Sequence, residues 1–452
     1  MLHLVLFAGL ALVSMGGSEP LRSVDITSDF ERTETPTPVI EETTPPPEKE
    51  KPTYEDVDDV PEDEFDDPIE EEDEIVGDPE SPTDQPLSED TIGMIGTAGG
   101  LWNGAYSQRQ GHGRGGDGGG TDATPLSENA VNKGLKWLAD HQEPDGHWDT
   151  KKWGGHGPYD PGICGLALLA FAGAGQTEKT GKYRRTVQKA IKWLAENQDT
   201  DGNFAPGQTM YSHAIPTLAL LESAAMAPIA RTRSIAKRGL DYMLNAQNQY
   251  KAWRYWPNDG DNDMSVTTWC VMAMKAANVA GFDVSNDAWG GVKAFLEEVT
   301  EPNYGQVGYT ARPVRGANEQ PFQKYSMTAC GLLCRLYLGE SRDTRLMRLG
   351  KQILMENLPE WDQPGINAPF FYYWYYGSLV MFQFEGKEWK RWNEKMHDLL
   401  IQHQISEQGE LEGSWDPPSE HHFGKMGGRV YSTAMGVLTL EVYYRYEIIS
   451  GK

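Results

Sequence analysis

Three aspartates alternate with other residues in NDGDNDMSVTTW, residues 258–269. Asp259, Asp261 and Asp263 have the spacing D-x-D-x-D. Clustered carboxylates can raise one another's pKa, so that one acts as a general acid, or they can bind a cation. A structural interpretation competes with both, because Asp263 directly precedes an apolar helical run, where a carboxylate caps the helix. We expect the cap; Asp261 and Asp263 are the candidate catalytic residues if the chain is an enzyme.

Residues that could bind zinc are present but are not grouped in the sequence. Besides Asp261 and Asp263, the candidates are one of Cys164, Cys270 and Cys330, and His213, His421 or His422. No C-x-x-C pair occurs, and no Cys/His cluster has zinc spacing. The two adjacent histidines lie in the polar stretch EHHFGK, which is typical of a surface loop. We therefore predict no metal site and no cofactor.

Aromatic residues provide the candidates for ligand binding. They are Trp256, Tyr372, Trp374 and Trp415, of which the middle two belong to FFYYWYYG, residues 370–377. Aromatic faces can line an apolar cavity and stabilise carbocations. Aromatics at consecutive positions cannot all face one way on a helix, so we expect several of them to pack in the core. The tryptophans in loops would also suit a glycan cleft, although no pair of catalytic carboxylates can be assigned.

These residues belong to a pattern of paired helices that recurs six times. Each unit reads as an amphipathic outer helix, a polar loop and a more apolar inner helix. Equivalent outer-helix positions, 46 to 58 residues apart, are Trp137, Trp193, Tyr242, Phe295, Ile353 and Leu399. Solenoid repeats are usually shorter and end in polar caps, whereas the last unit here is as apolar as the others. The units are therefore expected to close into a ring.

The inner helices share two columns of small residues. A serine near the helix start, at 212, 265, 326 and 432, suits a cap or first-turn position. A second column of compact residues is expected where the inner helices crowd together. Its members are Cys164, Pro216, Cys270, Cys330, Gly377 and Gly436. This column explains three of the four cysteines as apolar packing residues.

The loops between paired helices repeat a motif. Gln142, Gly146 and Trp148 have the pattern Q-x3-G-x-W, and residues 198–204 repeat it with Phe at the end. Glycine supplies a turn conformation, the amide can bond the loop backbone, and the ring can pack over the helix end. The loop is therefore interpreted as a brace. Unit three keeps the Gln and Trp but not the Gly, and unit six is aligned on Gln404 with Gly409 one residue late.

This repeated loop resembles that of squalene–hopene cyclases and related triterpene cyclases. The chain is similar to the terpenoid cyclase/protein prenyltransferase superfamily, most closely to bacterial proteins with prenyltransferase/squalene-oxidase repeats. The resemblance implies an all-α fold: an α/α toroid of six hairpins, with six inner and six outer helices, over residues 127–450. Triterpene cyclases protonate an alkene with a D-x-D-D-T-A motif. Here no adjacent Asp pair is followed by Thr, and the prenyltransferase D-x-C element is also absent.

The region before the helices has a different composition. Residues 1–18 hold an apolar run, expected to be a signal peptide or a short anchor. Residues 19–90 are expected to form a disordered acidic tether, since 41–90 carry 23 acidic residues and 2 lysines. Residues 91–126 are a Gly-rich linker. The formal charge of −27 is therefore local, because residues 91–452 hold 36 basic and 39 acidic residues.

The near-neutral remainder disfavours nucleic-acid binding, because it produces no long-range attraction for phosphates. We expect an exported protein, periplasmic or extracellular, with no integral membrane domain beyond the possible N-terminal anchor. Its expected function is a non-catalytic binding or scaffold module for an unidentified protein, glycan or lipid. The alternative is a cyclase-like enzyme acting on an isoprenoid. One toroid without a second helical domain, and without the cyclase acid motif, favours the first.

Overall fold

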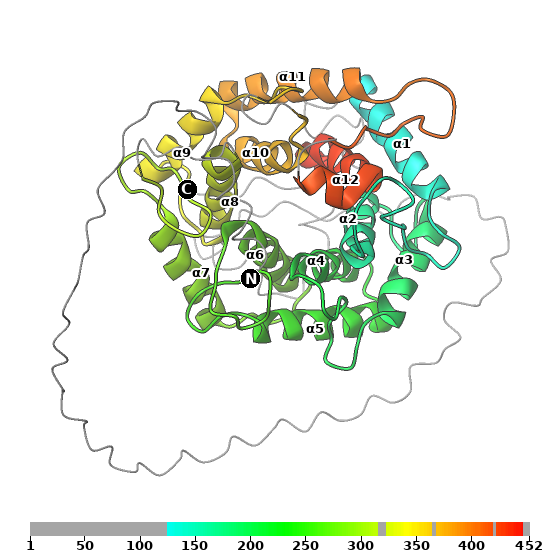
Figure 1. Ribbon diagram of the computed structural model, residues 1–452, viewed down its shortest axis with the longest axis horizontal. Coiled ribbons are helices and arrows are strands. Elements are labelled where there is room, and N and C mark those ends of the chain that lie inside the picture. Colours follow the sequence, from blue (N-terminus) through cyan, green and yellow to red (C-terminus); the bar gives the residue numbers. More distant parts are fainter. Residues whose placement is uncertain (1–123, 315–321, 364–367, 419–421, 446–452) are drawn as a thin grey trace, which may run out of the picture. The chain divides into compact units, whose positions relative to one another are not determined.

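The computed structural model describes residues 124–314, 322–363, 368–418 and 422–445. Outer and inner helices alternate along this part of the chain (Figure 1). The outer helices are α1 (Pro125–Asp140), α3 (Arg184–Glu196), α5 (Ala230–Asn245), α7 (Asn286–Val299), α9 (Arg345–Glu356) and α11 (Gly386–His403). The inner helices are α2 (Asp160–Gly173), α4 (Tyr211–Met226), α6 (Met264–Val279), α8 (Met327–Tyr337), α10 (Phe371–Phe384) and α12 (His422–Leu440). A short π-helix, η4 (Phe322–Ser326), precedes α8, and the short α13 (Val442–Arg445) follows α12.

Burial separates the two sets of helices. Every residue of α6 from Met264 to Met274 is buried, whereas α9 buries only Met347, Gly350 and Leu354. Apolar residues on all sides suit a helix surrounded by others, and an apolar stripe suits a helix that covers the core. The first outer helix starts two residues before position 127, the predicted start of the toroid, because the Thr124 side chain caps it by accepting a hydrogen bond from the Ser127 backbone N–H.

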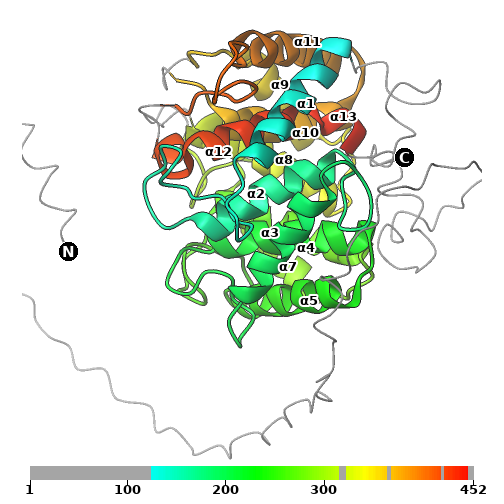
Figure 2. The same cartoon turned by 90° about the vertical axis from the view of Figure 1, so that its right-hand side faces the viewer.

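The helices of the described unit close on themselves. Around the inner ring each helix packs on the next, and α12 packs on α2. In the outer ring α11 lies beside α1, as Figures 1 and 2 both show. The hydroxyls of Ser127 and Tyr443, near the first and last described residues, are 3.3 Å apart. The predicted α/α toroid of six hairpins is confirmed.

The column of small residues lies where the helices are crowded. Cys164, Cys270 and Cys330 are fully buried free thiols. At Gly377 of α10, a Cβ atom would stand 2.4 Å from the ring of Trp392, which packs across from α11. A larger residue at Gly377 would push α11 away from α10. The cysteines are buried packing residues as predicted, but at Gly377 the crowding is with an outer helix and not with another inner helix.

The repeated loop joins neighbouring hairpins. Gln142 Nε2 donates to the carbonyl of Gly146 in its own loop at 2.8 Å. It also donates to Thr186 in the first turn of α3 at 2.9 Å. Gln198 and Gln247 make equivalent pairs of bonds, each to its own loop and to the next outer helix. The brace therefore links two hairpins, which is more than the loop-closing role expected from the sequence.

The sixth brace closes the ring, and its glycine is not Gly409. Gln404 Nε2 donates to Gly413 O and to Ala130 O of α1, both at 2.8 Å. Trp415 Nε1 donates to Leu400 O at 2.8 Å. The predicted alignment was wrong because the glycine stands nine positions after Gln404, against four positions after Gln142 in the first loop. The G-x-W spacing at the loop's end is unchanged.

The predicted leader, acidic tether and all but the last residues of the Gly-rich linker lie outside the described residues. Within the part that is described, no helix combines the length and apolar character needed to cross a bilayer.

Candidate active site

A cavity of about 420 Å³ opens at the end of the ring where the inner helices begin. Apolar side chains such as Ile163, Leu166 and Ile215 line one part of it. The rest of the wall is largely aromatic, formed by Tyr159, Tyr211, Tyr255, Trp269, Tyr309, Tyr372 and Tyr431. Its volume and lining are those of a site for a small apolar molecule.

Hydroxyl groups of these tyrosines form a connected polar edge. Tyr255 and Tyr309 approach each other at 2.5 Å between hydroxyl oxygens. The Tyr211 hydroxyl donates to Ser265 Oγ, and the Tyr372 hydroxyl donates to the Ser265 carbonyl at 3.2 Å. Burial raises the pKa of Tyr211, Tyr309 and Tyr372, so these hydroxyls stay protonated at neutral pH. The cavity thus offers neutral hydrogen-bonding groups beside an apolar surface.

Asp263 lies behind this edge and does not line the cavity. It is the N-cap of α6, and its Oδ1 accepts from Val266 N at 2.8 Å and Ser265 Oγ at 2.7 Å. Its Oδ2 accepts from the Tyr309 hydroxyl at 3.3 Å and lies 3.6 Å from Arg254 Nε. The expected helix cap is present, and every polar neighbour of the carboxylate is a donor.

Two opposing effects act on Asp263. Its side chain is 0% exposed, and this burial raises its pKa. The hydrogen bonds from Val266 and Ser265, the charge of Arg254 and the Tyr309 hydroxyl all lower the pKa, so they limit the rise. An alkene-protonating acid must instead be held neutral, with its proton facing the substrate.

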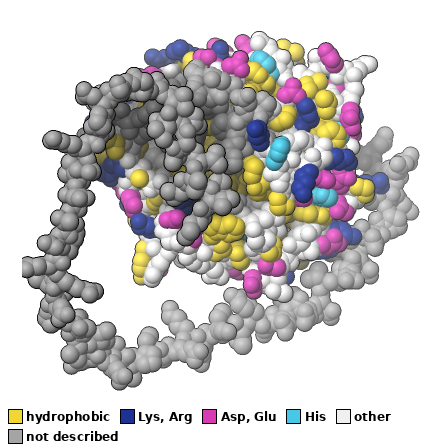
Figure 3. All heavy atoms as spheres, in the orientation of Figure 1, with side chains coloured by type: hydrophobic (Ala, Val, Ile, Leu, Met, Phe, Trp, Pro, Cys, Tyr) yellow, Lys and Arg dark blue, Asp and Glu magenta, His cyan; other side chains and the backbone are white. Residues whose placement is uncertain are grey.

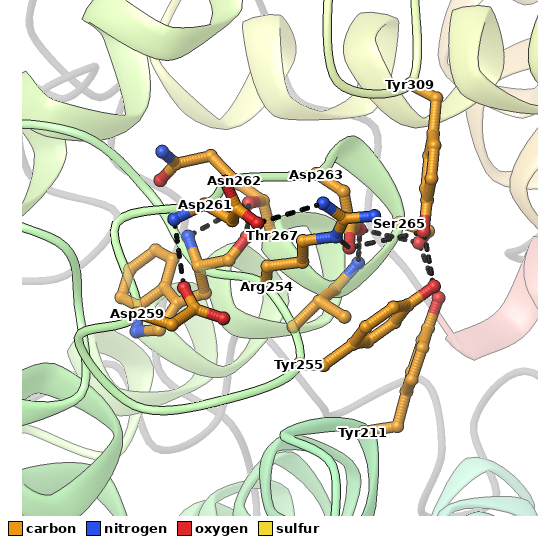
Figure 4. Close-up of polar contacts among 12 residues, drawn as sticks. Tyr211, Arg254, Tyr255, Asp259, Asp261, Asn262, Asp263, Ser265, Thr267 and Tyr309 are labelled. Atoms are coloured by element: carbon orange, nitrogen blue, oxygen red, sulfur yellow. Dashed lines mark hydrogen bonds and ion pairs between the residues drawn. The ribbon is translucent and has the colours of Figure 1, made fainter. Parts of the chain in front are cut away.

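The other two aspartates do not converge on Asp263. Arg254 lies between Asp261 and Asp263, and its Nη1 is 3.3 Å from Asp261 Oδ2. Its guanidinium also lies over the rings of Tyr255 and Tyr309. Asp261 is 71% exposed, and Asp259 Oδ1 accepts from the Asp261 backbone N–H. In Figure 4 Asp259 lies on the side of Arg254 away from the tyrosines. The D-x-D-x-D stretch is therefore a turn followed by a cap, with an arginine pairing two of its carboxylates.

Comparison with a family profile agrees with this architecture. The profile of the squalene–hopene cyclase C-terminal domain matches residues 120–259, which include the first three loops. Over this segment the chain is similar to the squalene–hopene cyclases. No curated protein sequence matches this cyclase-like chain.

Solved structures share its fold at low sequence identity. One is the type II terpene cyclase MstE from Scytonema, a variant in complex with geranylgeranyl dihydroxybenzoate. It has a TM-score of 0.50 and 10% identity, over 71% of this chain and 97% of the cyclase. A second is cellobiose 2-epimerase from Bacillus thermoamylovorans, with a TM-score of 0.50 and 12% identity over 70% and 97% of the two chains. These similarities show the α/α toroid alone, because an epimerase and a cyclase share it.

The predicted ligand-binding aromatics of the cyclase-like chain are not gathered in one place. Tyr372 lines the cavity. Trp256 follows the cavity residue Tyr255 but is 49% exposed and does not line the cavity itself. Trp374 is buried against Trp361 and Phe371. Trp415 is the aromatic residue of the sixth brace. Whether any of them contacts a ligand remains a prediction, and Tyr372 alone has the position for it.

The scattered zinc candidates also have structural roles where they are described. Both ring nitrogens of His213 are engaged: Nδ1 accepts from Phe204 N, and Nε2 donates to Gly239 O at 2.9 Å. Burial lowers its pKa to about 4, so the ring is neutral. His421 lies outside the described residues, as does the side chain of His422. Within the described ranges, no group of three or more His, Cys, Asp or Glu could hold a metal ion.

Sequence reasoning missed most of the cavity wall. Tyr211 and Tyr431 each precede a serine of the shared column, so the dipeptide Tyr-Ser was an available signal. Tyr255 stands two residues after Trp253, the last position of the third loop motif. Tyr309 likewise stands two residues after Val307, which ends the corresponding loop of unit four, where Glu301, Gly305 and Val307 replace Gln, Gly and Trp. These offsets become informative only once the repeats are aligned, because each tyrosine alone resembles a core residue.

Proposed function

We propose that this cyclase-like chain is a binding module that holds an apolar molecule with one polar end in the tyrosine-lined cavity. One observation carries the proposal: the cavity wall is aromatic and aliphatic, and the neighbouring carboxylate of Asp263 lies behind it. The apolar part of the ligand would pack on Leu166, Ile215 and Trp269. Its polar end would exchange hydrogen bonds with the tyrosine hydroxyls. We further propose that the protein acts outside the cytoplasm, since residues 1–18 have the composition of an export signal.

A lipid alcohol of isoprenoid type has this chemistry, and geranylgeraniol is a suitable probe. The full chain would be incubated with geranylgeraniol or with squalene, which lacks the hydroxyl, and the bound material would be measured by mass spectrometry. We expect geranylgeraniol to be retained unchanged at one molecule per chain. Retention of squalene should be weaker, because it cannot use the hydroxyls.

A pair of variants distinguishes cavity binding from surface adsorption. Ile215→Phe fills the cavity, so it should lower retention by roughly tenfold, equivalent to about 1.4 kcal/mol of binding free energy. Ile353→Phe, on outer helix α9 and outside the cavity, is the matched control and should retain the probe. Equal retention by both variants would contradict the proposal.

A cyclase-like enzyme is the second candidate, because a carboxyl group with a raised pKa lies one hydrogen bond from the cavity residue Tyr309. The donors around Asp263 argue against it, since they leave no oxygen that must carry a proton. The same incubation distinguishes the two candidates. A cyclised product that the wild type forms and the folded Asp263→Asn variant does not form would establish the enzyme and overturn the binding module.

A further inference from the structure

A second concavity lies on the outside of the ring, far along the chain from the cavity residues of α2 and α4. It is a groove of about 480 Å³ between outer helices α9 and α11. Its polar lining comes from Arg348, Lys351 and Gln352 of α9 and from Lys387, Glu388 and Arg391 of α11. Four cations and one carboxylate give the groove a net charge of +3.

Most of these cations lack a partner of opposite charge within the described residues. Lys351 Nζ lies 3.9 Å from Glu388 Oε1 and over the ring of Phe384. Arg348, Lys387 and Arg391 are exposed and form no ion pair with any described residue. Elsewhere Lys and Arg are mixed with Asp and Glu over the visible face in Figure 3, while several dark-blue side chains gather at its upper edge, where Figure 1 places α11. The groove is therefore a local excess of positive charge on a mixed surface.

The chain itself carries a matching segment. Residues 62–74, EDEFDDPIEEEDE, hold ten carboxylates in thirteen residues and no basic residue. We propose that this acidic segment docks in the α9/α11 groove of its own chain. Phe65 and Ile69, spaced among the carboxylates, provide apolar contacts for Met355 and for the aliphatic stems of the lysines at the groove.

The length of the intervening chain permits this contact. Residues 75–123 lead from the segment to Thr124, the first residue before α1. The C-terminal end of α11 is bonded to α1 through Gln404, and α11 has 18 residues, about 27 Å at 1.5 Å per residue. The groove, at the start of α11, is thus about 30 Å from Thr124, where residues 75–123 join the first helix of the ring. A flexible linker of 49 residues spans roughly 40 Å, so the segment would be held near the groove at an effective concentration in the mM range.

Docking of this kind has a consequence for other anions. Individual exposed ion pairs are weak. A tethered segment with ten charges can nevertheless break and re-form single ion pairs while the segment as a whole stays in the groove. It would compete with any external polyanion for the groove, and salt would weaken it because the charges are exposed. The inference does not depend on the proposed function, since the groove and the cavity share no residue.

Carbodiimide coupling on the full chain tests the contact, because it forms an amide between a carboxylate and a lysine amine that touch, with loss of water. We expect Lys387 and Lys351 to couple to residues 62–74 at low salt. Lys189 and Lys293, exposed on outer helices α3 and α7, are the matched lysines and should couple much less. Even coupling to all four lysines would overturn the proposal.

Two variants separate docking from chance encounter. Arg348→Glu combined with Arg391→Glu keeps both reactive lysines and should lower their coupling by roughly fivefold, as expected for losing two exposed ion pairs. Neutralising residues 70–74 (E70Q, E71Q, E72Q, D73N, E74Q) should raise binding of added heparin by a similar factor, because the groove becomes free. Unchanged coupling in the arginine variant, or equal heparin binding with and without the acidic charges, would show that the groove is not occupied by this segment. Circular dichroism melts would confirm that both variants fold.

Discussion

Asp263 shows how one residue can satisfy a structural role and resemble a catalytic one. It begins α6, accepts two hydrogen bonds through Oδ1, and lies next to tyrosines that line a cavity. Its burial raises the pKa, as it would in an acid catalyst, but the donors and Arg254 favour the ion. At this scale, the surroundings of the carboxylate carry more information than the residue type.

The raised pKa of Asp263 predicts a pH dependence of stability. Because the folded protein holds this proton more tightly than the unfolded chain, the stabilisation it provides is present below pH 3.8 and is lost as pH rises through the raised pKa. Asp263→Asn keeps an oxygen for the cap and cannot ionise, so it should lack this loss. Urea unfolding between pH 3.5 and roughly 7 should show that the free energy of unfolding of the variant rises relative to that of the wild type as the pH increases. The change should be about 1 kcal/mol or less at neutral pH.

The control for this measurement is Asp261→Asn, whose carboxylate is largely exposed and should change stability less. A difference between Asp263→Asn and wild type that does not vary with pH would contradict the assignment. If either variant abolished an activity without changing the unfolding curve, the structural account of these aspartates would be wrong.

At the scale of the elements, the glycine of the first, second and sixth braces is required by close approach as well as by conformation. Gly413 has a φ of +90°, and a Cβ there would stand 2.5 Å from the carbonyl oxygen of Lys133 in α1. Gly146 and Gly202 meet the next outer helix in the same way. In these three braces loop backbone lies against helix backbone, and a side chain in place of the glycine would separate two hairpins.

Gly413→Ala is therefore expected to destabilise the protein by about 2 kcal/mol, from an unfavourable φ and a clash with backbone. Gly290→Ala is the matched control, because Gly290 is exposed in α7 with nothing near its added Cβ. It should stabilise by about 0.5 to 1 kcal/mol, since alanine favours the helix. Thermal or urea unfolding of both variants measures the contrast, and equal effects would show that the sixth brace does not hold α11 to α1.

The whole described unit is a closed ring in which the first and last helices are neighbours. This closure predicts that the chain can be opened elsewhere. A circular permutant that joins residue 445 to residue 124 through a short Gly/Ser linker and opens at the exposed Pro228, between α4 and α5, should fold. Its single thermal transition should lie within roughly 5 °C of that of residues 124–445.

Opening the ring inside a brace provides the comparison. A permutant that starts at Gly202 cuts the loop that Gln198 ties to α5, so it should melt at a clearly lower temperature. If the opening at Pro228 is as damaging as the opening at Gly202, the braces do not carry the contribution assigned to them.

The sequence was sufficient for the fold because the same physical requirement recurs in each hairpin. Apolar inner helices, striped outer helices and the Gln-Gly-Trp loops all repeat, so each unit supports the interpretation of the others. The cavity could not be predicted in this way, since its wall takes single residues from different units, such as Tyr159, Tyr309 and Tyr431. Gly409 was misaligned for a related reason, because a longer loop hides the spacing until the contact with α1 is seen.

The sixth brace also constrains how this protein can change over generations. A gene for an open solenoid can gain or lose a repeat by duplication, because each new unit stacks on the last. Here Gln404 binds the first helix of the same chain, so a seventh hairpin added after the sixth would separate that pair and leave both without their partner. The longer loop from Gln404 to Gly413 still makes both bonds of its brace, so extra residues between these anchors are compatible with closure. New recognition surfaces can therefore arise on the loops while the number of hairpins stays at six.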